Sequence, residues 1–129
     1  MNNIKILHVV PTLKKDGAEV QLALQINNFI NVEAELFTFD MYREGNSVEN
    51  DLGSIKLHYG KIFKFFYLYR LIKKNNYKIV HSHLPKSDMA IGFLKYFDKS
   101  IHHVVSVHAQ YGTRKGESKF KYKFFNFFW

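Results

Sequence analysis

The fold is decided by the stretch Ile4-Lys5-Ile6-Leu7-His8-Val9-Val10, which Pro11 closes. Its β-branched and large apolar residues are typical of a strand buried in the middle of a sheet. The stretch is far shorter than the roughly 20 apolar residues of a membrane-spanning helix. Because Lys5 and His8 interrupt it, it does not resemble a signal-peptide core either. We therefore predict a central β-strand here.

From this strand onward, strand and helix patterns alternate along the chain. Such alternation predicts an α/β fold, a Rossmann-like three-layer domain with helices on both faces of a parallel sheet. Residues 11–16 form the first loop of this scheme. The other predicted elements are a helix over 17–30, a strand over 32–41, a loop over 43–53, a strand over 54–59, a helix over 62–75, a strand over 77–82, a helix over 85–96, a strand over 102–107 and a last helix from about 117 onward.

Composition and charge narrow the classes of function. The 129 residues suit one domain over 1–129, and 47% hydrophobic residues suffice for a packed core. The chain has no Cys, which excludes a disulfide framework, a thiol nucleophile and a cysteine-bound zinc site. Its net charge of +8 favours anionic partners, namely nucleic acid, acidic lipid or phosphorylated small molecules. No export or spanning segment is visible in the sequence, so we expect a soluble or peripheral protein.

The predicted topology also indicates where a ligand binds. In an open parallel sheet, ligands bind beyond the carboxyl ends of the strands, near the point where the strand order reverses. That rule selects three segments: residues 11–17, 81–83 and 108–110. Because His108 ends the fifth predicted strand, we expect its side chain to project into the crevice.

Two histidines close the fourth predicted strand. Strand alternation points His81 and His83 to the same side. Two histidines can bind a metal ion, but no third ligand lies nearby in sequence, and we expect Asp88 to cap its helix or face solvent. We therefore expect no metal site, and hydrogen bonding to a polyol substrate suits the pair better.

The first loop has two interpretations. Gly17 at a helix start would let a phosphate approach the unpaired backbone N–H groups, and Lys14 and Lys15 add positive charge. Alternatively, Asp16 is an ordinary N-cap and Gly17 a turn residue. The loop lacks the Gly-x-Gly-x-x-Gly pattern, which argues against a dinucleotide cofactor.

Two segments combine aromatic residues with cations. They cover residues 61–74 and 119–129, and their chemistry suits an anionic membrane surface or single-stranded nucleic acid. For the first segment we favour core packing with a basic outer edge, and for the second an exposed patch. The membrane-facing residues of this hypothesis are Lys61, Lys64, Lys73 and Lys74.

Three segments together resemble family-4 glycosyltransferases of the GT-B fold. The first is Ile6–Pro11 followed by Gly17-Ala18-Glu19, the second is Tyr77–His83, and the third is Val104–His108. Each is short, but together they cover most of the chain.

The resemblance implies a retaining transfer of a sugar from a nucleotide-sugar donor to a hydroxyl acceptor, without a metal ion or other cofactor. Backbone N–H groups of Gly17 and Ala18 would approach the donor diphosphate. His108 would contact the donor sugar near the reaction centre as the catalytic residue. The residues expected on the acceptor side are His83, His81 and Thr12.

The resemblance also implies a second domain and a cellular setting. The family holds the nucleotide on a carboxyl-terminal domain, and these 129 residues contain no such segment, so we expect a truncated acceptor-side half that is inactive alone. Its expected role is polysaccharide or cell-surface glycan assembly, in the cytoplasm or at the inner face of the membrane. One departure concerns the first loop, where Asp16 precedes a single Gly17 and the family usually has two or more glycines.

Other readings stay open. The chain suits a non-catalytic basic α/β module that docks on an anionic membrane or a partner chain. It suits a nucleic-acid binder less well, because no recognisable RNA or DNA motif is present. A missing neighbour strand would leave one sheet edge uncovered, so we expect self-association.

Overall fold

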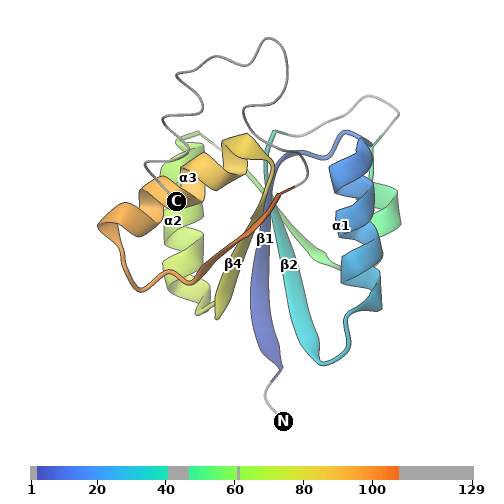
Figure 1. The fold of residues 1–129 in the computed structure, drawn as a ribbon, viewed down its shortest axis with the longest axis horizontal. Helices are drawn as coiled ribbons and strands as arrows, with labels where there is room; N and C mark the ends of the chain where they lie inside the picture. Colours follow the sequence, from blue (N-terminus) through green and yellow to red (C-terminus); the bar gives the residue numbers. More distant parts are fainter. Residues whose placement is uncertain (1–2, 41–46, 61, 108–129) are drawn as a thin grey trace.

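The computed structural model describes residues 3–40, 47–60 and 62–107, and it confirms the α/β fold (Figure 1). Its five strands are all parallel and follow the order β3-β2-β1-β4-β5. The strand order therefore reverses between β1 and β4, as in Rossmann-like domains. The elements are β1 (Ile4–Thr12), α1 (Gly17–Asn28), β2 (Val32–Asp40), the 3₁₀ turn η1 (Glu49–Leu52), β3 (Lys56–Tyr59), α2 (Lys64–Asn75), β4 (Ile79–His83), α3 (Pro85–Phe97) and β5 (His103–Ser106).

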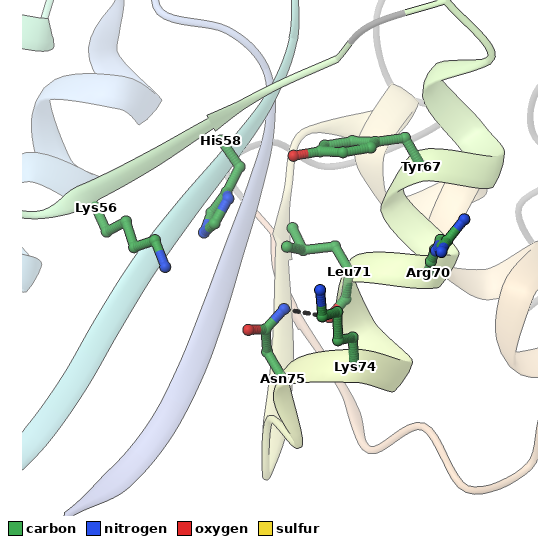
Figure 2. Close-up of a pocket in the computed structure, with 7 residues that line it drawn as sticks. All are labelled: Lys56, His58, Tyr67, Arg70, Leu71, Lys74 and Asn75. Atoms are coloured by element: carbon green, nitrogen blue, oxygen red, sulfur yellow. Dashed lines mark hydrogen bonds between the residues drawn. The ribbon is translucent and has the colours of Figure 1, made fainter.

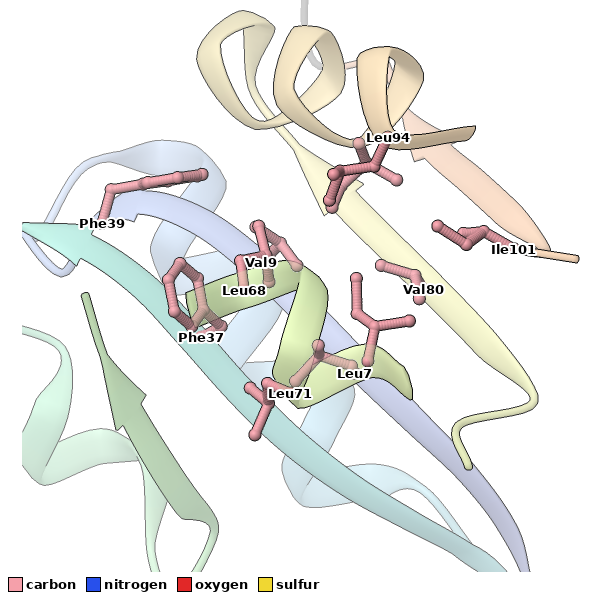
Figure 3. Close-up of a cluster of buried hydrophobic side chains, with 11 residues drawn as sticks. Leu7, Val9, Phe37, Phe39, Leu68, Leu71, Val80, Leu94 and Ile101 are labelled. Atoms are coloured by element: carbon pink, nitrogen blue, oxygen red, sulfur yellow. The ribbon is translucent and has the colours of Figure 1, made fainter. Parts of the chain in front are cut away.

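Helices cover both faces of the sheet, which gives the three layers. Helix α1 lies on one side, and α2 and α3 lie on the other (Figure 1). On the α2 side, Leu7 and Val9 of β1 pack with Phe37 of β2 and with Leu68 of α2 (Figure 3). All four side chains are 0% exposed, so this cluster is the main hydrophobic core.

A smaller core lies under α1. There Val10 of β1 and Leu36 of β2 pack against Leu22 and Ala23 of the helix. Because successive strand residues point to opposite faces, the central strands are apolar on both faces. The predicted central strand at residues 4–10 is therefore confirmed as β1.

The predicted boundary between the first strand and its loop was wrong. Pro11 and Thr12 were assigned to the loop, but β1 continues through both and pairs Thr12 with Asp40 of β2. The pairing of β1 with β4 stops at Val9, so Pro11 has a neighbouring strand on one side only. Proline lacks the N–H of an interior strand residue, and that one-sided position tolerates it.

The other described elements agree with the prediction within a few residues at each end. The helix predicted from residue 117 onward, with its aromatic patch, lies outside the described residues. Within the described part of the chain, no helix has the length and apolar character needed to cross a membrane.

Candidate functional site

The candidate site lies at the carboxyl ends of β1, β4 and β5, which are neighbours in the sheet. We call this edge, together with the start of α1, the carboxyl-end rim. Gly17 begins α1 directly after the loop that follows β1, and His83 is the last residue of β4. The predicted segments 11–17 and 81–83 therefore meet at one edge. The predicted catalytic residue His108 lies outside the described residues.

A cluster of three histidines lies on the α1 side of the sheet. The rings of His81 and His83 have centroids 4.2 Å apart, which confirms that both point to the same side of β4. His8 of β1 joins them, because the sheet register places it beside His81. Its Nδ1 lies 3.1 Å from Nε2 of His83, within hydrogen-bonding distance. We call these three residues the histidine cluster.

Burial controls the protonation of His8. His8 is 0% exposed, and the loss of solvation lowers its pKa to about 3, with a further contribution from neighbouring His81. The ring is therefore neutral at physiological pH. His81 is held by a hydrogen bond of 2.7 Å between its Nε2 and Oγ of Ser106 on β5. Neutral imidazoles of this kind can both donate to and accept from ligand hydroxyls.

Among the described residues, these three histidines also form a group that could bind a metal ion. One nitrogen from each ring lies within 4.8 Å of the others. The sequence argument found no third ligand near His81 and His83 because His8 lies 75 positions before His83. The only sequence signal for His8 was a histidine within a largely apolar strand.

The start of α1 exposes backbone N–H groups toward the rim. Asp16 occupies the N-cap position, as the second interpretation of this loop predicts, but its side chain makes no capping hydrogen bond. Among the described residues beyond its neighbours and its own helix, a Cβ added to Gly17 would meet no atom within 4 Å. The positive end of the helix dipole lies at this position.

The polar residues of the loop before α1 differ in whether other residues of the chain already bind their side chains. Lys15 forms an ion pair of 3.0 Å with Asp51, whereas Lys14 is exposed. Thr12 is partly buried, and its hydroxyl accepts a hydrogen bond of 3.3 Å from the backbone N–H of Lys14. The Thr12 side chain therefore stabilises the loop that leads to Gly17.

Sequence reasoning missed a buried carboxyl group in the first turn of α1. Glu19 is 2% exposed, and its Oε2 has no hydrogen-bond partner among the described residues. Burial raises the pKa of Glu19, while its own backbone N–H opposes that shift. A buried carboxyl group with an oxygen that lacks a hydrogen-bond partner costs stability, and its place near Gly17 makes it part of the rim.

Asp88 was expected to cap its helix or face solvent, and that prediction was wrong. It is 3% exposed and accepts a hydrogen bond of 2.6 Å from the Ser82 hydroxyl. The cause is strand alternation, since Ser82 points to the α3 side while its neighbours point to the α1 side. Nε2 of His103 lies 2.7 Å from the same hydroxyl, and burial lowers the pKa of His103 to about 4. This polar network ties β4, α3 and β5 together.

Two of the predicted membrane-facing lysines, Lys64 and Lys73, do not share one surface. Lys64 and Lys73 are nine positions apart on α2, which places them on opposite sides of a helix with about 100° per residue. Lys64 pairs with Asp40, and Lys73 pairs with Asp98 at 2.9 Å. Lys74 lies in a separate pocket beside β3, and Lys61 lies outside the described residues.

Comparison with known proteins agrees with this geometry. A search among curated proteins finds no match to the chain. Residues 6–129 match the family model described as Glycosyltransferase Family 4, which covers nearly the whole sequence and every part of the rim. The chain therefore belongs to glycosyltransferase family 4, and its general function is that of a glycosyltransferase domain.

Proposed function

We propose that this chain is the acceptor-side half of a retaining glycosyltransferase, which transfers a sugar from a nucleotide-sugar donor to a glycan or lipid-linked acceptor. The observation that carries the proposal is the carboxyl-end rim, where the open start of α1 and the histidine cluster follow adjacent strands. Helix starts of this kind bind phosphate groups, and neutral imidazoles bind hydroxyls. A diphosphate and a polyol are the two binding partners that sugar transfer requires.

Each part of the rim has a separate task in this proposal. The backbone N–H groups of Gly17 and Ala18 bind the donor diphosphate and reduce the charge that builds up on it during transfer. His83, with His81 and Thr12, orients the acceptor hydroxyl, and His108 contacts the donor sugar. No metal ion or other cofactor takes part, because the helix start supplies the positive potential. The nucleotide is held by a second domain, so the isolated chain has no turnover.

The proposed setting is the assembly of polysaccharide or other cell-surface glycans. The enzyme works in the cytoplasm at the inner face of the membrane. The high positive charge of the chain supports this setting, because that membrane face is anionic.

Substitution of Gly17 by alanine tests the diphosphate site. Among the described residues beyond its neighbours and its own helix, a methyl group at Gly17 meets no atom, so the variant should fold with a melting temperature no lower than that of wild type. The methyl group would occupy the space that a phosphate needs, and we expect the affinity for pyrophosphate to fall at least about tenfold. NMR titration followed at the amide signal of Ala18 measures this affinity. The matched control is Gln21→Ala, an exposed position of the same helix, and equal affinity of G17A and wild type would contradict the proposed site.

Turnover assays test the proposed division of labour between two domains. The isolated chain, mixed with several nucleotide sugars and glycan acceptors, should release no nucleoside diphosphate. The full two-domain enzyme should be active, and a chelator should not lower its rate. Robust turnover by the isolated chain would refute the second-domain argument.

Membrane docking is a second candidate function, and an exposed aromatic face supports it. The face comprises Phe65 and Phe66 of α2 and Phe93, Tyr96 and Phe97 of α3. The rings of Phe65 and Phe93 join the two helices at 5.3 Å. Aromatic side chains beside lysines suit the interface of an anionic bilayer.

Sedimentation with anionic vesicles tests this second candidate. The double variant Phe93→Ser/Phe97→Ser should bind less, whereas Leu24→Ser, at an exposed position on the α1 side, should bind like wild type. Joint neutralisation of Lys61, Lys64, Lys73 and Lys74 tests the basic helix, and unchanged binding would exclude it as the anchor. Light scattering tests self-association, and a clean monomer at high concentration would contradict it.

A further inference from the structure

A second polar cavity lies away from the carboxyl-end rim. It is bounded by β3 and by the second half of α2 and has a volume of about 410 Å³ (Figure 2). Lys56 begins β3 and Asn75 ends α2, so the cavity lies toward the amino-terminal ends of the strands. This is the edge opposite to Gly17 and the histidine cluster.

Three cations line this cavity without a carboxylate partner among the described residues: Lys56, Arg70 and Lys74. On the same helix, by contrast, Lys64 pairs with Asp40 and Lys73 with Asp98. Like charges repel one another when no counter-ion lies between them. The cavity therefore holds an uncompensated positive charge, and we call it the cationic pocket.

A buried carboxylate on the neighbouring strand makes its direct contacts with other residues. Glu35 is 3% exposed, and its oxygens contact Lys5 at 3.0 Å, His58 at 2.5 Å and the Tyr77 hydroxyl at 2.5 Å. Burial acts to raise its pKa, but the hydrogen bonds from Tyr77, His58 and Lys5 outweigh burial and lower the pKa to about 2. These three donors occupy its oxygens, and among the described residues it forms no ion pair with Lys56, Arg70 or Lys74.

The walls of the pocket combine donors with apolar surface. Figure 2 shows Lys56 and His58 extending from β3 and the Tyr67 hydroxyl pointing toward His58, while Arg70 lies on the far side of Leu71 from Lys56. A hydrogen bond of 2.9 Å from the Asn75 side chain to the Leu71 carbonyl holds the Asn75 amide at the end of the pocket where α2 ends. The volume falls within the range of small-molecule sites, and the Tyr67 ring and Leu71 offer an apolar wall.

We propose that the cationic pocket binds a phosphate ester. The ammonium groups of Lys56 and Lys74 can donate charge-assisted hydrogen bonds to phosphate oxygens. The ester is either a free sugar phosphate, which is a monoester, or the phosphodiester headgroup of a phospholipid, since both present anionic phosphate oxygens. This site is separate from the proposed donor site at Gly17, and it does not depend on the proposed transferase activity.

NMR titration of the isolated chain tests the proposal, with the ring signals of His58 as the reporter. The probes are inorganic phosphate, glucose 6-phosphate, and vesicles of phosphatidylcholine with or without phosphatidylglycerol. Wild type should bind at least one phosphate probe saturably. The variant Lys56→Gln/Lys74→Gln should weaken that binding about tenfold or more, because two charge-assisted contacts are lost. The control Lys78→Gln/Lys99→Gln removes the same charge from exposed positions outside the pocket and should bind like wild type.

The probes distinguish the two sources of phosphate. Saturable binding of glucose 6-phosphate that the pocket variant loses identifies a soluble ligand. Loss of binding to phosphatidylglycerol vesicles in the pocket variant, with none to the free probes in wild type, identifies a lipid headgroup. Equal affinities of the pocket variant and the control, for every probe, would overturn the proposal. Both variants keep Gly17 and the aromatic face. Because Lys74 also belongs to the basic helix tested above, the single variant Lys56→Gln, on β3, is compared with Lys78→Gln. Weaker binding by Lys56→Gln assigns the loss to the pocket, and equal binding would assign it to the helix and overturn the proposal.

Discussion

Acid should destabilise this fold through His8, and the substitution His8→Asn should remove that effect. The His8 ring is fully buried at the centre of the sheet, and burial lowers its pKa from 6.5 to about 3. The folded chain therefore stays neutral at this residue while the unfolded chain binds a proton below pH 6.5. Stability is present above that pH and is lost as the pH falls. Asparagine does not titrate, and its amide can still donate to Nε2 of His83.

The size of the effect follows from the two pKa values. Each pH unit below 6.5 costs the folded state about 1.4 kcal/mol, until the pKa of the folded chain is reached. Between about pH 7.5 and 4.5, the loss through His8 is therefore about 3 kcal/mol. Small domains have a total stability of roughly 5–15 kcal/mol, so this loss is measurable. His103 also titrates with a lowered pKa, but it is present in both proteins and cancels in the comparison.

Urea unfolding followed by far-UV circular dichroism measures the effect across this pH range. Wild type should lose about 3 kcal/mol more than His8→Asn between the two ends of the range. His102→Asn serves as the control, because His102 is exposed and its removal should leave the wild-type pH dependence unchanged. Parallel pH profiles for wild type and His8→Asn would refute the argument that His8 is buried and neutral in the cluster.

Three further predictions concern stability. Glu19→Gln should raise the free energy of unfolding at neutral pH by roughly 1–2 kcal/mol, because burial raises the pKa of Glu19 and its ionised form destabilises the fold as the pH rises. Urea unfolding at neutral and mildly acidic pH measures this gain. A gain that does not shrink at acidic pH would contradict the prediction. Glu35→Gln should lower the free energy of unfolding at neutral pH by about 3 kcal/mol, because folding lowers the pKa of Glu35 from 4.5 to about 2 and the stabilisation is lost as the pH drops through that interval. The control is Glu33→Gln, since the Glu33 side chain is 58% exposed. Equal losses of stability in the two variants would exclude the buried network as the cause. Leu7→Ala should lower the free energy of unfolding by about 2–5 kcal/mol, because it leaves a cavity beside the central strand. Ile4→Ala, at a half-exposed position of the same strand, should change it little. Thermal unfolding compares the two variants, and a loss below about 1 kcal/mol for Leu7→Ala would contradict the described packing.

The fold class and the position of the rim could be predicted from sequence because they depend on local patterns. The apolar run at 4–10 and the alternating helices and strands predict a parallel sheet, and a parallel sheet places the carboxyl ends of its strands along one edge. Strand alternation likewise placed His81 and His83 on one side. These inferences need no knowledge of which strand lies beside which.

Contacts between distant segments could not be predicted, because they depend on strand order and register. His8 joins the histidine cluster since β1 lies beside β4 with His8 opposite His81. Asp88 is buried because α3 packs on the face to which Ser82 points. The cationic pocket exists because β3 and α2 bring Lys56 and Lys74 together. Local sequence determined the elements and the edge that carries the site, whereas tertiary packing decided which side chains meet and which charges lose their solvent.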